Sequence, residues 1–295
     1  MCLPRPGNKS IRSPLAAAAA VLLAALTLAS GSAAAQQRPA PAPPGAEQAY
    51  QQCMALARTR PDAAFTQAMQ WRARGGGFAA EHCEALALMG LRNFAEAAKR
   101  FHDVAEGAKG EPETLRIEAY DQAAQAWLLA NEPKKAKAEF DAALKLDPKN
   151  VDLLIGRGQA AGLGGDFFAA LDDLNAALDI DPKRADALVL RAASYRRVKA
   201  EDLALDDVNR AIQIDPEFPD AYVERGILMA MKGDYDAARR DWNKVVEMAP
   251  DTFLAQQAKR NLVELDRLSN KSAQPPADKS APDKSKKSTK TPPKG

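Results

Sequence analysis

The residues best suited to chemistry lie in the N-terminal half of the chain. Cys53 and Cys83 are accompanied by His82 and His102, and thiolate and imidazole are side chains that bind zinc. His82 and Cys83 are adjacent, however, and neighbouring residues of a helix point about 100° apart, which is poor geometry for one ion. We therefore predict no metal and no cofactor, and we interpret His82 and His102 as surface or groove residues.

A second set of charged residues recurs along the chain. Arginine occurs three times at one spacing, and an aspartate follows each time at a constant distance: Arg157 and Asp173, Arg191 and Asp207, Arg225 and Asp241. The planar guanidinium matches a carboxylate, and a partly buried arginine needs such a partner. Because every arginine comes with its own aspartate, we favour a structural Arg–Asp ladder. The alternative is a row of arginines that binds an anionic ligand.

The sequence carries no recognisable catalytic motif. It lacks the His-Glu-x-x-His zinc motif, the Gly-x-Ser-x-Gly nucleophile elbow, the P-loop and the dinucleotide fingerprint. Its carboxylates fall on amphipathic stretches, where most belong to solvated faces. The formal net charge of +2 argues neither for nucleic acid nor for an acidic substrate. We therefore predict that the protein is not an enzyme.

Residues 1–35 have the pattern of a secretory signal peptide. Three positive charges precede an uncharged apolar run, which ends in an Ala-x-Ala cleavage site. Cleavage would place the mature chain in the periplasm; an uncleaved membrane anchor is the alternative. Cleavage would also remove Cys2 and leave two cysteines in an oxidising compartment. We therefore expect a disulfide between Cys53 and Cys83.

The elements that must position these side chains repeat at a constant period. Asp147-Pro148, Asp181-Pro182 and Asp215-Pro216 follow one another at intervals of 34 residues, and Ala249-Pro250 continues the series. Counting back from each proline gives four units: 117–150, 151–184, 185–218 and 219–252. Each unit holds two stretches with apolar residues three and four apart, which indicates two helices, and Asp-Pro ends the second. No strand-like alternation of useful length occurs, so we predict an all-α fold.

The four units resemble tetratricopeptide repeats, and the exported bacterial type in particular. That family carries a large, a small and an aromatic residue in the first helix of each pair, and alanine, aromatic, alanine and proline in the second. The first unit matches both patterns with Tyr120, Ala124 and Trp127, then Ala136, Phe140, Ala143 and Pro148. The resemblance implies a right-handed superhelical solenoid of antiparallel helix pairs with a C-terminal capping helix.

The flanking segments complete this organisation. Residues 46–116 are predicted to form divergent helix pairs and residues 253–268 the capping helix. Residues 36–45 are a proline-rich leader, and residues 269–295 are predicted to be a disordered Lys/Pro/Ser-rich tail. The tail holds seven lysines and two aspartates, a charge of +7 − 2 = +5, which suits weak contact with anionic envelope polymers.

In tetratricopeptide proteins the first helices line a concave groove. Carried over by position, the groove here comprises Asp121, Gln125, Ile155, Gln159, Val189, Arg196, Arg197, Val223, Ile227 and Met231. Its acidic edge (Glu118, Asp152, Asp186 and Asp220) also has a simpler explanation, because carboxylates in a first turn complement the helix dipole. Capture of a C-terminal carboxylate is excluded, since the matching positions lack the lysine and asparagine that it needs.

We therefore predict a non-enzymatic scaffold of the cell envelope that binds a protein or peptide segment in this groove. A glycan-processing envelope enzyme, or an accessory subunit of one, is the alternative. A cytoplasmic nucleic-acid binder that uses the basic tail is a third class, and we do not favour it.

Overall fold

The computed structural model describes residues 45–273, and every regular element in that range is an α-helix. The helices are α1 (Ala46–Thr59), α2 (Pro61–Ala73), α3 (Gly77–Gly90), α4 (Phe94–Gly107), α5 (Glu113–Leu129), α6 (Pro133–Leu146), α7 (Val151–Leu163), α8 (Phe167–Ile180), α9 (Ala185–Arg197), α10 (Glu201–Ile214), α11 (Pro219–Met231), α12 (Tyr235–Met248) and α13 (Phe253–Ala273). The predicted signal peptide, the leader except Gly45, and residues 274–295 of the tail lie outside the described residues.

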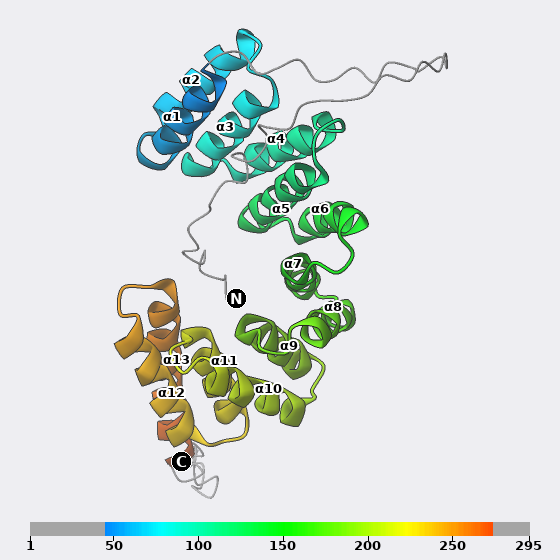
Figure 1. Ribbon diagram of the computed structural model, residues 1–295. Helices are drawn as coiled ribbons and strands as arrows, with labels where there is room; N and C mark the ends of the chain where they lie inside the picture. Colours follow the sequence, from blue (N-terminus) through cyan, green and yellow to red (C-terminus); the bar gives the residue numbers. More distant parts are fainter. Residues whose placement is uncertain (1–44, 274–295) are drawn as a thin grey trace, which may run out of the picture. The chain divides into compact units, whose positions relative to one another are not determined.

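The helices pack in consecutive pairs (Figure 1). From α1 to α10 each helix contacts the next one along the chain, and first helices of neighbouring pairs also touch, α1 with α3, α5 with α7 and α7 with α9. Each of the predicted 34-residue units corresponds to one such pair, although α5 begins at Glu113, before the predicted start of the first unit at residue 117. The all-α expectation is therefore confirmed for the part of the chain that the structure describes.

One turn geometry joins the two helices of a pair. The residue before the second helix's N-cap has a positive φ in five pairs: Arg92, Asn131, Gly165, Lys199 and Gly233. The next N–H then donates to a carbonyl five residues back, as from Asp166 N to Ala161 O at 2.9 Å. Lys199 stands where two of the other pairs have glycine, yet it adopts the left-handed conformation with φ 64°, and the same turn forms.

Small residues at fixed positions of the second helices allow this close packing. Ala136, Ala170 and Ala204 are 0% exposed, as are Ala143, Ala177 and Ala211 one to two turns later. Between them Phe140, Leu174 and Val208 fill the space against the first helices, also at 0%. Burying each of these three side chains stabilises the fold by about 1.5–3 kcal/mol, which explains why the period of the apolar residues is so regular.

The chain divides into two compact units, with the boundary between Ala221 and Tyr222 inside α11. This boundary lies within the predicted repeat 219–252. In the second unit Trp242 of α12 donates its indole N–H to the carbonyl of Val223 on α11 at 3.2 Å, so these two helices pack together. Helix α13 covers α12 with Ala255, Ala258 and Leu265, all at most 1% exposed.

The C-terminal helix α13 is longer than the sequence predicted. Helix α13 continues to Ala273, so residues 269–273 are helical and do not belong to a disordered tail. The apolar face of this helix is anchored at the three buried positions above, whereas Leu254 and Leu262 are only partly buried. No helix in residues 45–273 is both long and apolar enough to cross a membrane.

Candidate binding surface

Three arginines join the two helices of their pairs through paired hydrogen bonds. Arg157 on α7 donates from Nε and Nη2 to the two carboxylate oxygens of Asp173 on α8, at 2.9 and 2.6 Å. Arg191 on α9 contacts Asp207 on α10 in the same way, at 2.7 Å for both bonds. In the second compact unit Arg225 contacts Asp241 at 2.8 and 2.6 Å. These bidentate bonds are the strong, charge-assisted kind.

The third arm of the guanidinium reaches the preceding pair. Arg157 Nη1 donates to Asp141 on α6 at 2.8 Å, and Arg191 Nη1 donates to Asn175 on α8 at 2.8 Å. Each of these arginines therefore holds three helices together. The hydrogen bond to Asp207 raises the pKa of Arg191, so its charge is fixed at any physiological pH. The donors are thus used within the fold, which favours the structural interpretation over an anion-binding row.

The N-terminal pairs carry the same ladder with its charges reversed. Glu84 on α3 is 2% exposed and forms ion pairs with Arg100 on α4 and Arg72 on α2, at 3.1 and 3.2 Å. When the second helices are aligned on Phe101 and Phe140, Glu84 falls at the arginine position and Arg100 at the aspartate position. Sequence reasoning missed this group because the signs are exchanged and the register is shifted.

A histidine links the pair with reversed charges to the next pair. His102 Nδ1 on α4 lies 2.9 Å from a carboxylate oxygen of Glu139 on α6. Burial opposes protonation, but the hydrogen bond to Glu139 and the negative charges of Glu139, Glu106 and Asp103 together outweigh it and raise the pKa of His102. The prediction that His102 is an ordinary surface residue is therefore incomplete, since its ring forms a link between helix pairs.

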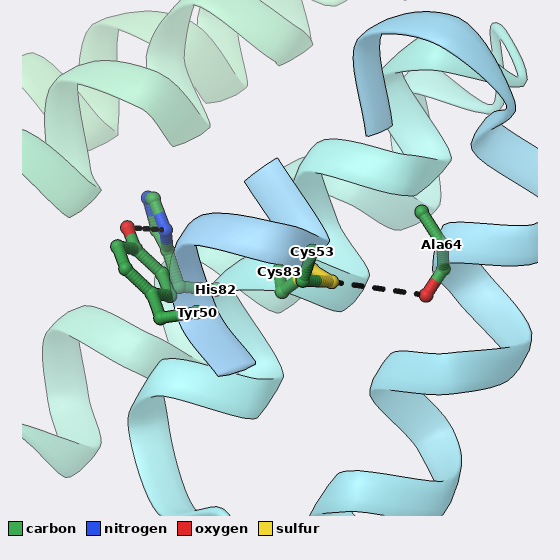
Figure 2. The surroundings of a disulfide bond; sticks show 5 residues. All are labelled: Tyr50, Cys53, Ala64, His82 and Cys83. Carbon is green, nitrogen blue, oxygen red and sulfur yellow. Dashed lines mark hydrogen bonds between the residues drawn. A yellow bond between two sulfur atoms is a disulfide. The ribbon is translucent and has the colours of Figure 1, made fainter. Parts of the chain in front are cut away.

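A disulfide joins the first helices of the two N-terminal pairs. Cys53 on α1 and Cys83 on α3 are bonded, with Cα atoms 6.1 Å apart, and both are 0% exposed (Figure 2). The Cys53 sulfur lies 3.9 Å from the carbonyl oxygen of Ala64 on α2. The surrounding core is built mostly of alanines, including Ala57 and Ala68. In the described residues no group of three His, Cys, Asp or Glu side chains is placed to hold a metal ion.

His82, the residue before Cys83, forms hydrogen bonds on both ring nitrogens, and Figure 2 shows the one that joins it to Tyr50. Its Nδ1 lies 2.8 Å from the Tyr50 hydroxyl, and its Nε2 lies 2.6 Å from the amide oxygen of Gln122 on α5. An amide oxygen can only accept, so Nε2 carries the proton and Nδ1 accepts from Tyr50. Burial lowers the pKa of His82, which favours this neutral form. Three first helices therefore contact the partly buried ring, and the interpretation of His82 as a surface or groove residue stays a prediction.

The predicted groove residues of the first compact unit differ widely in exposure. Ile155, Gln159 and Val189 are buried at 7%, 5% and 4%, so these side chains serve packing between helices more than an open surface. Asp121, Gln125 and Arg196 are partly buried, and Arg197 is exposed with its guanidinium 4.7 Å from the Phe167 ring centroid. In the second unit Val223 is buried, Ile227 is partly buried and Met231 is 51% exposed.

A strip of mostly polar residues runs over two neighbouring first helices, from exposed Glu118 and Asp152 to buried Ile155 and Gln159. We call it the first-helix strip and define it as Glu118, Asp121, Gln122 and Gln125 on α5 with Asp152, Ile155 and Gln159 on α7. Each set lies on one helix face because its members are three, four or seven residues apart. Helices α5 and α7 touch, so the two faces are neighbours.

Asp121 is electrostatically the most perturbed member of the first-helix strip. Burial, together with the nearby carboxylates of Asp152 and Glu118, raises the pKa of Asp121 to about 6, although a hydrogen bond from Gln125 opposes the shift. That hydrogen bond is long, at 3.4 Å. Elsewhere buried carboxylates such as Asp173 meet an arginine, whereas the charges that act most strongly on Asp121 are negative.

Comparison with known proteins gives matches at the level of structure alone. No family model matches the sequence, and no curated protein matches it. The crystal structure of yeast Tom70 is similar with a TM-score of 0.56 and 17% identity, over 76% of this chain and 47% of Tom70. YrrB, described as a tetratricopeptide protein with an unusual peptide-binding site, gives 0.45 and 22%, over 67% of this chain and 98% of YrrB. MamA gives 0.46 and 22%, over 56% and 93%.

Because all these identities are low, the likeness establishes the fold alone, and only the Tom70 match is strong enough to carry that conclusion. The class of protein is an all-α solenoid built from consecutive helix pairs. Within that class the chain has the tetratricopeptide-repeat fold, as the sequence indicated.

Proposed function

We propose that the protein is a scaffold that binds a segment of another protein along its first helices. One observation carries the proposal: two polar groups of the first-helix strip, the Asp121 carboxylate and the buried amide nitrogen of Gln159, are poorly satisfied by hydrogen bonds within the described residues. The ladder arginines donate their hydrogen bonds to side chains on neighbouring helices. The partly buried carboxylate of Asp121, in contrast, accepts one long hydrogen bond, from Gln125. Polar groups held in place at such a cost to stability are typical of binding sites.

The binding mode that fits is recognition of a short segment, either extended or helical. Helices α5, α7 and α9 touch in sequence, so positions that recur every 34 residues form a row along which a segment can lie. The partly exposed members of this row are polar on α5, and the more deeply placed ones on α7 and α9 are the apolar Ile155 and Val189 and the polar Gln159. Such a row suits a segment with one polar and one apolar side.

Site-directed photocrosslinking in intact cells tests this function. A photoreactive residue at Gln125, on the first-helix strip, is expected to capture a protein partner. The matched control is the same residue at Asp206, an exposed position on the second helix α10. Equal capture at both positions, or capture at Asp206 alone, would refute binding along the first helices. Turnover of cell-wall fragments by the purified protein would instead favour an envelope enzyme.

We also propose that the protein works in the periplasm after removal of residues 1–35. The signal-like sequence supports this location, and so does the Cys53–Cys83 bond, because disulfides persist in oxidising compartments. In that location the basic residues 274–295 would add weak attraction to anionic envelope polymers. N-terminal sequencing of the protein isolated from cells tests the location, and a mature chain that still begins at Met1 would contradict it.

A further inference from the structure

The charges around the first-helix strip do not balance. Arg184 bridges Asp152 at 2.6 Å and Asp186 at 2.7 Å, so one cation serves two carboxylates. Asp152 in turn acts on Asp121, and so does Glu118. This connected group therefore contains four carboxylates and one guanidinium, a net charge of −4 + 1 = −3.

The first turn of a helix explains part of this charge but not Asp121. Helix α5 begins at Glu113, so Asp121 lies in the third turn, beyond the reach of the helix dipole. Asp121 is also withdrawn from water, unlike an ordinary solvated carboxylate. Within the described chain, Glu84 is a more deeply buried carboxylate, and the fold neutralises it with two arginines at 3.1 and 3.2 Å.

A second observation points to a ligand at the same place. Gln159 on α7 is 5% exposed, and its amide nitrogen has no hydrogen-bond partner among the described residues. It lies seven residues after Asp152 and four after Ile155, on the face of α7 that forms the first-helix strip. A buried donor without an acceptor is costly, so such a group is expected to gain from an acceptor that arrives from outside.

The missing complement beside Asp121 is thus a positively charged group with a hydrogen-bond acceptor nearby. A metal ion supplies the charge but no acceptor, and an anion worsens the imbalance. A lysine or arginine residue of a polypeptide supplies both, since its side chain is cationic and its backbone carbonyl accepts. Burying the aliphatic stem against Ile155 keeps the charged end near the carboxylates.

We propose that the first-helix strip receives one lysine or arginine residue of a bound partner segment, with the cation beside Asp121 and Glu118 and a backbone carbonyl facing Gln159. This inference rests on the proposed function and specifies the chemistry of the partner. It commits to a segment of a separate protein as the occupant.

Peptide selection on the full chain tests it. A phage-displayed library of random 12-residue peptides is selected against the wild-type protein, and the enriched sequences are expected to share one lysine or arginine. Replacing that residue in a synthetic peptide by norleucine should weaken binding about 10-fold or more, the value of a partly desolvated charged hydrogen bond. Asp121→Asn should weaken the lysine peptide by a similar factor and leave the norleucine peptide unchanged. The control is Asp206→Asn, which should alter neither affinity.

Misfolding can be separated from lost binding, because Asp121→Asn removes a carboxylate that burial penalises. We expect the melting temperature of this variant to equal or exceed that of the wild type. Binding weakened by Asp121→Asn with an unreduced melting temperature supports the inference, whereas equal weakening of the lysine and norleucine peptides overturns it.

The remaining outcomes separate the two proposals. Enriched peptides that crosslink at Gln125 but show no preference for lysine or arginine would overturn this inference and leave the proposed function standing. Failure of every enriched peptide to crosslink there would contradict the proposed function itself. Selection that succeeds only after the lysines of residues 274–295 are replaced by glutamine would identify the chain's own tail as the occupant, and would overturn the assignment to a separate protein.

Discussion

If the Arg–Asp ladder stabilises the fold, replacing the buried carboxylate of Asp207 should lower the free energy of unfolding substantially. Asp207→Ala removes both hydrogen bonds from Arg191 Nε and Nη2, each 2.7 Å long, and leaves only the bond from Nη1 to Asn175. Removing one partner of a buried ion pair costs about 3–5 kcal/mol. The Arg191 side chain keeps 17% of its exposure, so water partly replaces the lost partner and the lower end applies, about 3 kcal/mol.

This loss converts into a shift that calorimetry resolves. For domains of 150–250 residues, about 1 kcal/mol corresponds to about 2–4 °C, so Asp207→Ala should lower the melting temperature by about 6–12 °C. Hydrogen exchange should place the loosening in α8, α9 and α10, the helices that Arg191 joins. The neighbouring Asp206→Ala is the control, because Asp206 is exposed on the same helix and should change stability by less than about 0.5 kcal/mol.

A double-mutant cycle decides whether the pair itself is responsible. Arg191→Ala and Asp207→Ala together should cost clearly less than the sum of the two single changes, since the second change removes a group already left without its partner. A melting temperature for Asp207→Ala within 2 °C of the wild type, or strict additivity in the cycle, would refute the ladder as a stabilising element.

Three further predictions concern the rest of the described chain. Replacing Cys53 and Cys83 by alanine should destabilise the N-terminal helix pairs by about 3–4 kcal/mol, from the loop entropy of a 30-residue separation, measured by urea unfolding. Because burial lowers the pKa of His82, the unfolded chain binds its proton first, so this residue's contribution to stability should be present above about pH 6.5 and be lost as pH falls below it. Gly226→Ala should cost about 1–2 kcal/mol, since its Cβ would lie 2.4 Å from the Trp242 indole nitrogen.

Each of these has a matched control. Reduction of the wild-type disulfide should reproduce the effect of the cysteine replacements, and an unchanged urea midpoint would contradict the entropy argument. His82→Gln should flatten the fall in stability between pH 7.5 and 5, and a parallel profile for both proteins would exclude the histidine as its cause. Gly162→Ala, whose Cβ would meet nothing nearer than 3.7 Å, should stabilise α7 by about 0.5–1 kcal/mol, opposite in sign to Gly226→Ala.

The helix pairs could be predicted because the repeat period carries nearly all the information that they need. A turn of one geometry and a buried apolar position recur every 34 residues, so local pattern and packing agree. The partners of Arg157 and Arg191 could be anticipated for the same reason, since both members of each pair recur together 16 residues apart.

The N-terminal polar contacts could not be predicted in this way. Glu84 lies in a pair that is shifted by extra residues between α4 and α5, and its charge is the reverse of its counterparts', so no repeat links it to the ladder. The burial of His82 depends on Tyr50 and Gln122, which lie 32 and 40 residues away. The depth of Ile155 and Val189 likewise depends on how closely neighbouring first helices approach, which the position within a repeat does not reveal.

The reversal of sign at Glu84 makes the repeats of the first compact unit unequal as modules. Loss of residues 151–184 during evolution would bring Asp141 to the place of Asn175, and Arg191 would still find an acceptor. Loss of residues 117–150 would instead remove Asp141 and Glu139 and set His102 opposite Arg157, so that Arg157 would meet an imidazole in place of a carboxylate. The repeat that holds α7 and α8 can therefore be lost while the arginine contact to the preceding pair is kept. Loss of the pair α5 and α6 would break the corresponding contact of Arg157.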